Sequence, residues 1–223
     1  MRNRVLALCV PVLVAVAPLG AQFAPTGTSG TISGATYGGS GLGGTTVMSG
    51  GVGGVTIGIG AHARFANTPV TNNGAGTYFA EAGGDVLDGA PTLARWNFAF
   101  FIGGPASCSY DYRLSYDNNP ASGNALAPYP GTGGIFSGAA MCSFIGPTWQ
   151  DSENIGFGFL GGNPNPSGEY NFAIQQFDHA TGAELARVAI LVDVSAVPEP
   201  ASLALFATGL VGLGVVARRK NRA

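Results

Sequence analysis

Few residues of this chain have the types and spacing that catalysis requires. Its only histidines, His62 and His179, lie far apart and outside any His-Glu-x-x-His pattern, and no paired Cys-x-x-Cys accompanies them, so we expect no zinc site. No Gly-x-Ser-x-Gly nucleophile elbow is present either. Because both histidines have turn-forming neighbours, we expect them in turns. The sequence therefore predicts no catalytic residue and no enzyme activity.

Paired carboxylates are the one catalytic arrangement that stays open. Asp151 with Glu153, or Asp111 with Asp117, have the residue types that glycoside hydrolysis uses. Acidic residues beside strands are usually solvated, so we expect neither pair to form a site. A surface carbohydrate-binding module or glycan hydrolase remains an alternative function.

Oxygen-rich turns at 117–119 and 151–154 contain the hard ligands that Ca²⁺ prefers, although the EF-hand spacing is absent. Asx turns use the same residues for backbone hydrogen bonds. We expect no cofactor, and a weak calcium site is the only one left open.

The elements that would position these residues are predicted to be strands. From residue 77 the apolar residues alternate with a period of two, and Gly, Pro and Asn clusters separate the runs. Strands are expected at 96–102, 108–116, 135–145 and 154–160, and a hairpin at 170–177 and 185–194 turns at 178–182. Period-two aromatic residues, including Trp96 and Trp149, are expected in the core rather than on a sugar-stacking platform. We predict an all-β, antiparallel sandwich or jelly-roll-like domain at 77–196.

Residues 22–76 are rich in glycine, serine and threonine, above all between 27 and 60. Such a segment buries little surface and loses much backbone entropy on ordering. We expect a low-complexity linker or short edge strands there.

Charge is segregated along the chain. Only 10% of the residues are charged, and between the two ends four arginines stand against eleven acidic residues, a net charge of −7. Without a basic stripe to neutralise phosphates, no nucleic-acid partner is expected. The other basic residues flank apolar runs at the two ends, which is typical of membrane topology signals.

Residues 1–21 have the pattern of a secretory signal peptide. Arg2 and Arg4 precede an apolar stretch at 5–17, and small residues end at Ala21, where we expect cleavage. As a helix this stretch spans only about 20 Å, too short for a hydrocarbon core of about 30 Å.

After signal removal Cys108 and Cys142 remain, an even pair in an oxidising compartment. We expect a disulfide that closes a loop of about 34 residues and stabilises by about 3–4 kcal/mol in the chain-entropy model. Two buried free thiols are the alternative.

Residues 197–223 combine three features in order. The prolines of Pro198-Glu199-Pro200 hold an extended motif, and the uncharged stretch 201–217 is about 25 Å long as a helix, enough for a marginal membrane span. A basic cluster follows: Arg218, Arg219, Lys220 and Arg222. The positive-inside rule then places the body of the protein outside the cytoplasm. A permanently anchored single-pass membrane protein is the alternative.

This combination resembles the PEP-CTERM sorting signal of Gram-negative bacteria. The resemblance implies that a membrane-embedded cysteine peptidase, exosortase, recognises Pro198-Glu199-Pro200 and removes the span. It also implies an inner-membrane intermediate, then delivery to the cell surface or extracellular matrix, where exopolysaccharide is a further partner. We therefore expect an exported structural or adhesive protein, although the resemblance covers only residues 197–223.

Overall fold

The computed structural model describes residues 23–44, 46–65, 67–87, 89–121, 126–130 and 136–196. The expected signal peptide at 1–21 and the expected sorting segment at 197–223 lie outside these residues. In the part of the chain that is described, no helix is long and apolar enough to cross a membrane.

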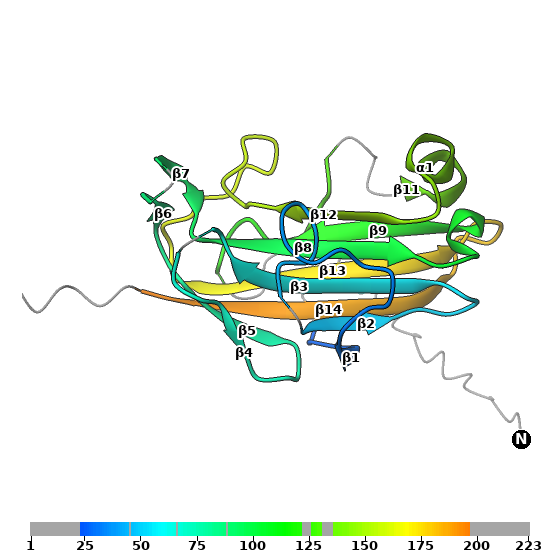
Figure 1. Cartoon of the computed structure of the whole chain (residues 1–223), viewed down its shortest axis with the longest axis horizontal. Helices are drawn as coiled ribbons and strands as arrows, with labels where there is room; N and C mark the ends of the chain where they lie inside the picture. Colours follow the sequence, from blue (N-terminus) through cyan, green and yellow to red (C-terminus); the bar gives the residue numbers. More distant parts are fainter. Residues whose placement is uncertain are drawn as a thin grey trace, which may run out of the picture.

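Strands dominate the fold, and most of them belong to two large sheets (Figure 1). The first sheet has the order β1-β2-β3-β8-β12, and every neighbouring pair in it is antiparallel. Its strands are β1 (Thr28–Gly30), β2 (Val47–Gly50), β3 (Thr56–Ala63), β8 (Trp96–Gly103) and β12 (Trp149–Glu153). The glycine-rich stretch thus contains β1, β2 and most of β3, and β3 lies inside the sheet, paired with β8 along its whole length.

The second sheet has the order β10-β9-β13-β14-β5-β4, with β11 also paired to β9. Its strands are β4 (Thr71–Asn72), β5 (Thr77–Glu81), β9 (Tyr110–Tyr116), β10 (Ala127–Pro128), β11 (Phe136–Ser137), β13 (Gly168–Asp178) and β14 (Glu184–Ser195). A separate two-stranded sheet joins β6 (Gly84–Asp85) to β7 (Ala90–Ala94).

The predicted hairpin is confirmed, because β13 and β14 pair antiparallel from Gly168 opposite Val194 onward. Its turn is closed by Asp178, whose Oδ1 accepts hydrogen bonds from the Thr181 backbone N–H and hydroxyl, each within 2.8 Å. The expectation of a wholly antiparallel fold is wrong at one pair, since β5 lies parallel to β14. Many residues separate these two strands, and only a long connection allows parallel neighbours.

The two sheets pack against each other through one apolar core. Trp96 of β8 meets Tyr170 of β13 edge to face with ring centroids 5.5 Å apart, and Phe98 stacks on Phe172 at 4.5 Å. The predicted inward faces are confirmed, because every member is at most 1% exposed: Trp96, Phe98, Phe100, Ile102, Val188, Ile190, Val192 and Val194. The result is the face-to-face layering of a sandwich.

The outer face of the first sheet is covered as well. Alternate residues of β8 point outward, and two of them, Ala99 and Phe101, pack in a second apolar cluster with Ile32, Leu42 and Val47. The glycine-rich segment between β1 and β2 therefore lies on the sheet. It can do so because β3 presents glycine to it: a Cβ on Gly58 would lie 2.2 Å from Ile32 Cδ1.

Two glutamine side chains form hydrogen bonds that hold glycine-rich turns against the sheets. The Gln150 amide accepts a hydrogen bond from Thr36 N (2.8 Å) and donates one to Thr36 O (3.0 Å). Gln176 of β13 does the same with Val52, at 3.0 and 3.1 Å. Each amide thus imitates a neighbouring peptide and satisfies backbone groups that a loop leaves unpaired.

Two stretches have different secondary structure from that expected. Residues 138–145 form the helix α1 (Gly138–Ile145) rather than a strand, and 154–160 are turns. Ser137 begins the helix, because its hydroxyl accepts from Ala140 N. Gly138 packs so closely that a Cβ there would lie 2.2 Å from Tyr110 O. Sequence periodicity does not distinguish a short apolar run of either kind.

The expected disulfide is present. Cys108 lies in the short 3-10 helix η1 (Ser107–Ser109) and Cys142 in α1, and their Sγ atoms are bonded. The bridge ties α1 to the start of β9, and Figure 1 shows α1 at one end of the strands and the β6–β7 sheet at the other.

We predict that Gly58→Ala lowers the free energy of unfolding by about 1–3 kcal/mol, because the new methyl group meets Ile32 Cδ1. Ile32→Val removes that carbon, so the double variant should lose less than the two single losses added together. Urea denaturation measures all three. Gly30→Ala is the matched control, since nothing lies within 4 Å of a Cβ there; simple additivity of the two changes would contradict the prediction.

Candidate functional site

A hydrogen-bonded histidine on the outer face of the first sheet marks the candidate site. His62 lies in β3 opposite Asn97 of β8, so the prediction that it lies in a turn is wrong. Apolar Ile57, Ile59 and Ala61 occupy every second position, and His62 comes next on the opposite face. This period of two is the signal that identifies the strand. His179 does lie in the turn after β13.

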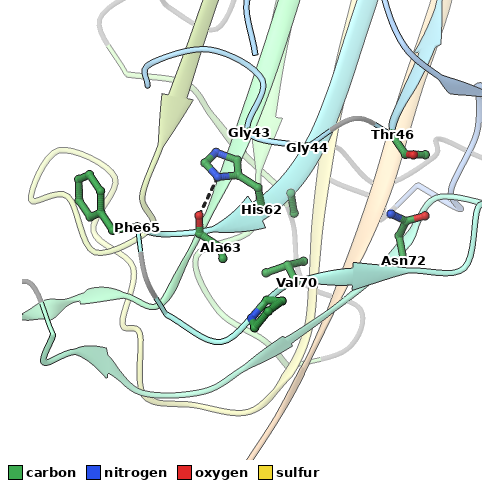
Figure 2. Close-up of a pocket in the computed structure, with 10 residues that line it drawn as sticks. Gly43, Gly44, Thr46, His62, Ala63, Phe65, Val70 and Asn72 are labelled. Atoms are coloured by element: carbon green, nitrogen blue, oxygen red, sulfur yellow. Dashed lines mark hydrogen bonds between the residues drawn. The ribbon is translucent and has the colours of Figure 1, made fainter. Parts of the chain in front are cut away.

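Both imidazole nitrogens of His62 have partners inside the protein. Nδ1 lies 2.8 Å from the carbonyl oxygen of Ala63 (Figure 2), and Nε2 lies 2.8 Å from Ser152 Oγ. A carbonyl only accepts, so the geometry assigns the proton to Nδ1 and leaves Nε2 to accept the Ser152 hydroxyl. Burial lowers the pKa of His62, and the hydrogen bond to Ala63 opposes that shift.

The chain of hydrogen bonds continues across β8 and past the end of β12. Asn97 Nδ2 donates to Ser152 Oγ at 3.0 Å, and Asn154 Nδ2 donates to Asn97 Oδ1 at 2.7 Å. Asn154 in turn accepts from Ala94 N and is fully buried. A network paired at each of these points makes the His62 wall rigid.

The contact between Ser152 and His62 has the length of a serine nucleophile with its base. Two features set it apart from such a pair. The Asn97 amide donates to the same serine oxygen, which withdraws one of its lone pairs, and a backbone carbonyl rather than a carboxylate orients the imidazole. This arrangement supports a fixed wall better than an activated nucleophile.

A cavity opens beside His62 in two adjoining lobes, of about 340 and 230 Å³. Both lobes are lined by Gly43, His62, Ala63 and Phe65. The larger also reaches Thr46, Val70 and Asn72, and the smaller reaches Gly38, Gly39 and Asn97. Figure 2 shows Phe65 and Asn72 at opposite ends of the larger lobe.

Phe65 has an unusual conformation at the cavity. It is 73% exposed and its φ is +47°, the one non-glycine residue with positive φ among those described. Bulky side chains rarely adopt that region, and such strain concentrates at binding and active sites. The Arg64 guanidinium lies 4.6 Å from the ring centroid, and Arg64 Nε donates to the buried Asp85 Oδ2 at 2.9 Å.

Of the two carboxylate pairs, one shares a face and the other does not. Asp151 and Glu153 are two apart in β12, opposite Phe100 and Phe98, so both point toward the inner side of the sheet. Asp111 and Asp117 stand at the two ends of β9, about 20 Å apart at strand rise. Asp111 instead contacts His179 Nδ1 at 3.0 Å.

Glu153 is 5% exposed, and its carboxylate accepts a hydrogen bond from the Tyr129 hydroxyl. Burial raises the pKa of Glu153 and outweighs the opposing effect of that hydrogen bond. The Glu153–Tyr129 pair lies beside a group of aromatic rings, because Tyr129 and Trp149 both contact Phe100. As expected, Trp96 is buried in the core, whereas Trp149 lies half-buried at this edge.

The oxygen-rich turns use their side chains locally. Asp117 Oδ1 accepts from Asn119 N, and Asp151 Oδ1 accepts from Ser152 N. Among the described residues, no group of three or more His, Cys, Asp or Glu side chains is placed to hold a metal ion.

The expected sorting residues lie outside the described part of the chain: Pro198, Glu199, Pro200, Arg218, Arg219, Lys220 and Arg222. The same is true of the expected cleavage position, Ala21. Comparison with known proteins covers the motif prolines, Glu199, Arg218, Arg219 and Lys220, but neither Arg222 nor Ala21, which stay predictions.

The described residues define a β-rich protein with one disulfide and a small polar cavity. The PEP-CTERM protein-sorting motif matches residues 196–220 of this chain. The chain therefore carries a PEP-CTERM sorting motif, which implies an exported protein that exosortase processes. No curated protein and no solved structure matches the chain.

We predict that folding stability falls as the pH is lowered through about 6.5, the ordinary pKa of histidine. In that range the histidine of the unfolded chain binds a proton, whereas half-buried His62 in the folded chain stays neutral to lower pH, so acid favours unfolding. His62→Gln should remove this part of the pH dependence. Denaturant titrations across the range, with the His62 ring followed by NMR, measure both; titration of the ring at 6.5 or above would contradict the prediction.

We predict that Glu153→Gln raises the melting temperature at neutral pH. The folded-state pKa is raised above 4.5, so the charged carboxylate is unfavourable in the fold and stability declines as the pH rises through that folded-state pKa. Glutamine still accepts from Tyr129 without that charge, and its advantage should shrink near pH 4.5. Asp151→Asn, half-buried on the same strand, is the matched control and should change the melting temperature less.

Proposed function

We propose that this protein is a structural or adhesive protein of the bacterial cell surface or extracellular matrix, and not an enzyme. Its C-terminal segment directs it there, and exosortase removes the predicted span after an inner-membrane intermediate. The carrying observation is the sorting motif at residues 196–220. The disulfide supports the same role, because such bonds persist in oxidising compartments.

The position of the last strand supports removal of the tail. β14 ends at Ser195, where the backbone carbonyl accepts from Ala82 N at 2.9 Å and the hydroxyl donates to Ala80 O. The sorting motif begins at the next residue. Cleavage at or beyond the prolines therefore costs the two sheets no strand and no hydrogen bond of β14.

The disulfide and the covered outer face suit a protein that must persist outside the cell. The Cys108–Cys142 disulfide joins α1 to the segment before β9. The bond lowers the conformational entropy of the unfolded chain. The second apolar cluster buries Ala99 and Phe101 on the outward face of β8. Little of this apolar surface is therefore exposed for nonspecific association. A permanently anchored membrane protein is the competing proposal.

We predict that deleting Pro198–Ala223 leaves the protein in the periplasm, whereas the full chain reaches the surface or the medium. A triple variant with Pro198→Ala, Glu199→Gln and Pro200→Ala should keep the span and accumulate as the uncleaved, inner-membrane form. Immunoblots of cell fractions and intact-mass measurement of the mature protein are the readouts. Glu169→Gln, an exposed acidic change outside the motif, is the matched control.

Two outcomes would overturn the proposal. Normal delivery of the deletion variant would show that the tail is not the address. A mature wild-type protein that keeps the mass of residues 201–223 would instead establish permanent anchoring.

A further inference from the structure

We propose that the cavity beside His62 binds a neutral saccharide unit. This inference goes beyond surface delivery and depends on the described residues alone. It assigns to the exported body a ligand site of its own, built where the glycine-rich segment, β3 and the β4 strand meet.

The size of the cavity suits a small ligand. Its two lobes share His62 and Phe65 in their linings; the larger, about 340 Å³, falls at the lower end of the volumes of small-molecule sites, and the smaller, about 230 Å³, lies below that range. The lining combines glycine backbone and neutral polar side chains with small apolar residues and Phe65, and Arg64 borders the smaller lobe. Such a wall favours a compact, hydroxyl-rich molecule over a lipid chain.

Phe65 supplies an aromatic surface at the rim. The residue is 73% exposed on a backbone with φ +47°, and the Arg64 guanidinium lies 4.6 Å from the ring centroid, over one face. The C–H groups of a sugar ring carry slight positive charge and pack on the negative face of an aromatic ring, as cations do more strongly. Phe65 does not contribute to the core, so its exposed ring is available to stack against a sugar ring at the cavity.

Opposite Phe65, the larger lobe presents hydrogen-bonding groups that the protein itself does not use. Asn72 Oδ1 accepts from Gly74 N, which leaves the side-chain NH₂ for a ligand. The Thr46 hydroxyl lines the same lobe and makes no hydrogen bond to any described residue, although the Thr46 carbonyl accepts from Tyr78. A donor amide and a hydroxyl are the groups that pair with sugar hydroxyls.

The charges around the cavity disfavour ionic ligands. The Arg64 guanidinium is engaged by the buried Asp85, and no acidic residue is among the described residues that line either lobe. His62 donates from Nδ1 to Ala63 and accepts at Nε2 from Ser152, so its nitrogens are not directed at a ligand. A phosphate would find no free cation here, and a metal ion would find no set of ligands.

Two glycines at the cavity differ in the space around them. A Cβ on Gly43 would lie 2.0 Å from His62 Cγ, so this residue packs directly on the imidazole. A Cβ on Gly44 would meet nothing closer than 3.8 Å, so its position borders empty space. This contrast allows the cavity to be filled without disturbing the fold.

The test uses the full chain, purified in a detergent without a sugar headgroup. Cellobiose, maltose and N,N′-diacetylchitobiose are titrated while amide and side-chain NMR signals are followed. We expect saturable shifts at Thr46, Phe65 and Asn72 with at least one of the three sugars. Phe65→Ala should weaken that binding about tenfold, and Gly44→Leu should abolish it while the melting temperature stays within a few degrees of wild type.

Phe159→Ala, an exposed aromatic residue outside the cavity, is the matched control and should bind as wild type does. The inference is overturned if none of the sugars gives saturable shifts, if Phe65→Ala and Gly44→Leu bind as wild type does, or if inorganic phosphate gives the same shifts at lower concentration. None of these outcomes depends on where the cell delivers the protein, so failure here leaves the sorting proposal intact.

Discussion

The close approach of the glycine-rich segment to β3 is the constraint on which the rest of the structure depends. Glycine at position 58 leaves room for Ile32 to lie directly on the sheet, and glycine at position 60 leaves room for Val47 of the neighbouring strand β2. Their contacts bury Phe101 and Ala99, which would otherwise leave an apolar outer face on β8. The two glycines of β3 are therefore a packing requirement, because a Cβ at Gly58 would meet Ile32 of the covering segment and a Cβ at Gly60 would meet Val47 of β2.

The polar cavity lies where this apolar cover ends. Toward His62 the outward residues of the first sheet change from Phe101 and Ala99 to Asn97, and hydrogen bonds replace apolar contacts. Buried polar groups are costly unless paired, and the series through Ser152 and Asn154 pairs them. The same sheet face thus contributes to stability at one end and presents a rigid, polar surface at the other.

Delivery and fold are separate in this chain. The two sheets are complete at Ser195, and the sorting motif occupies residues 196–220. The physical demands on the two parts differ: the tail needs an extended motif, an apolar stretch and terminal positive charge, all of which are local properties of sequence. The body needs contacts between strands far apart in the chain.

That difference explains what could be predicted. The sequence by itself determined the sorting motif, the hairpin of β13 and β14, the inward face of β8 and the Cys108–Cys142 bridge, because each follows from local periodicity or from a count of two cysteines. Only the tertiary structure decided the parallel pairing of β5 with β14, the helix at 138–145 and the cavity beside His62. These depend on which distant segments meet: Gly138 is required by Tyr110, and His62 is held by Ser152 ninety residues away. Residue patterns show which face of an element is apolar, but they do not show what will cover it.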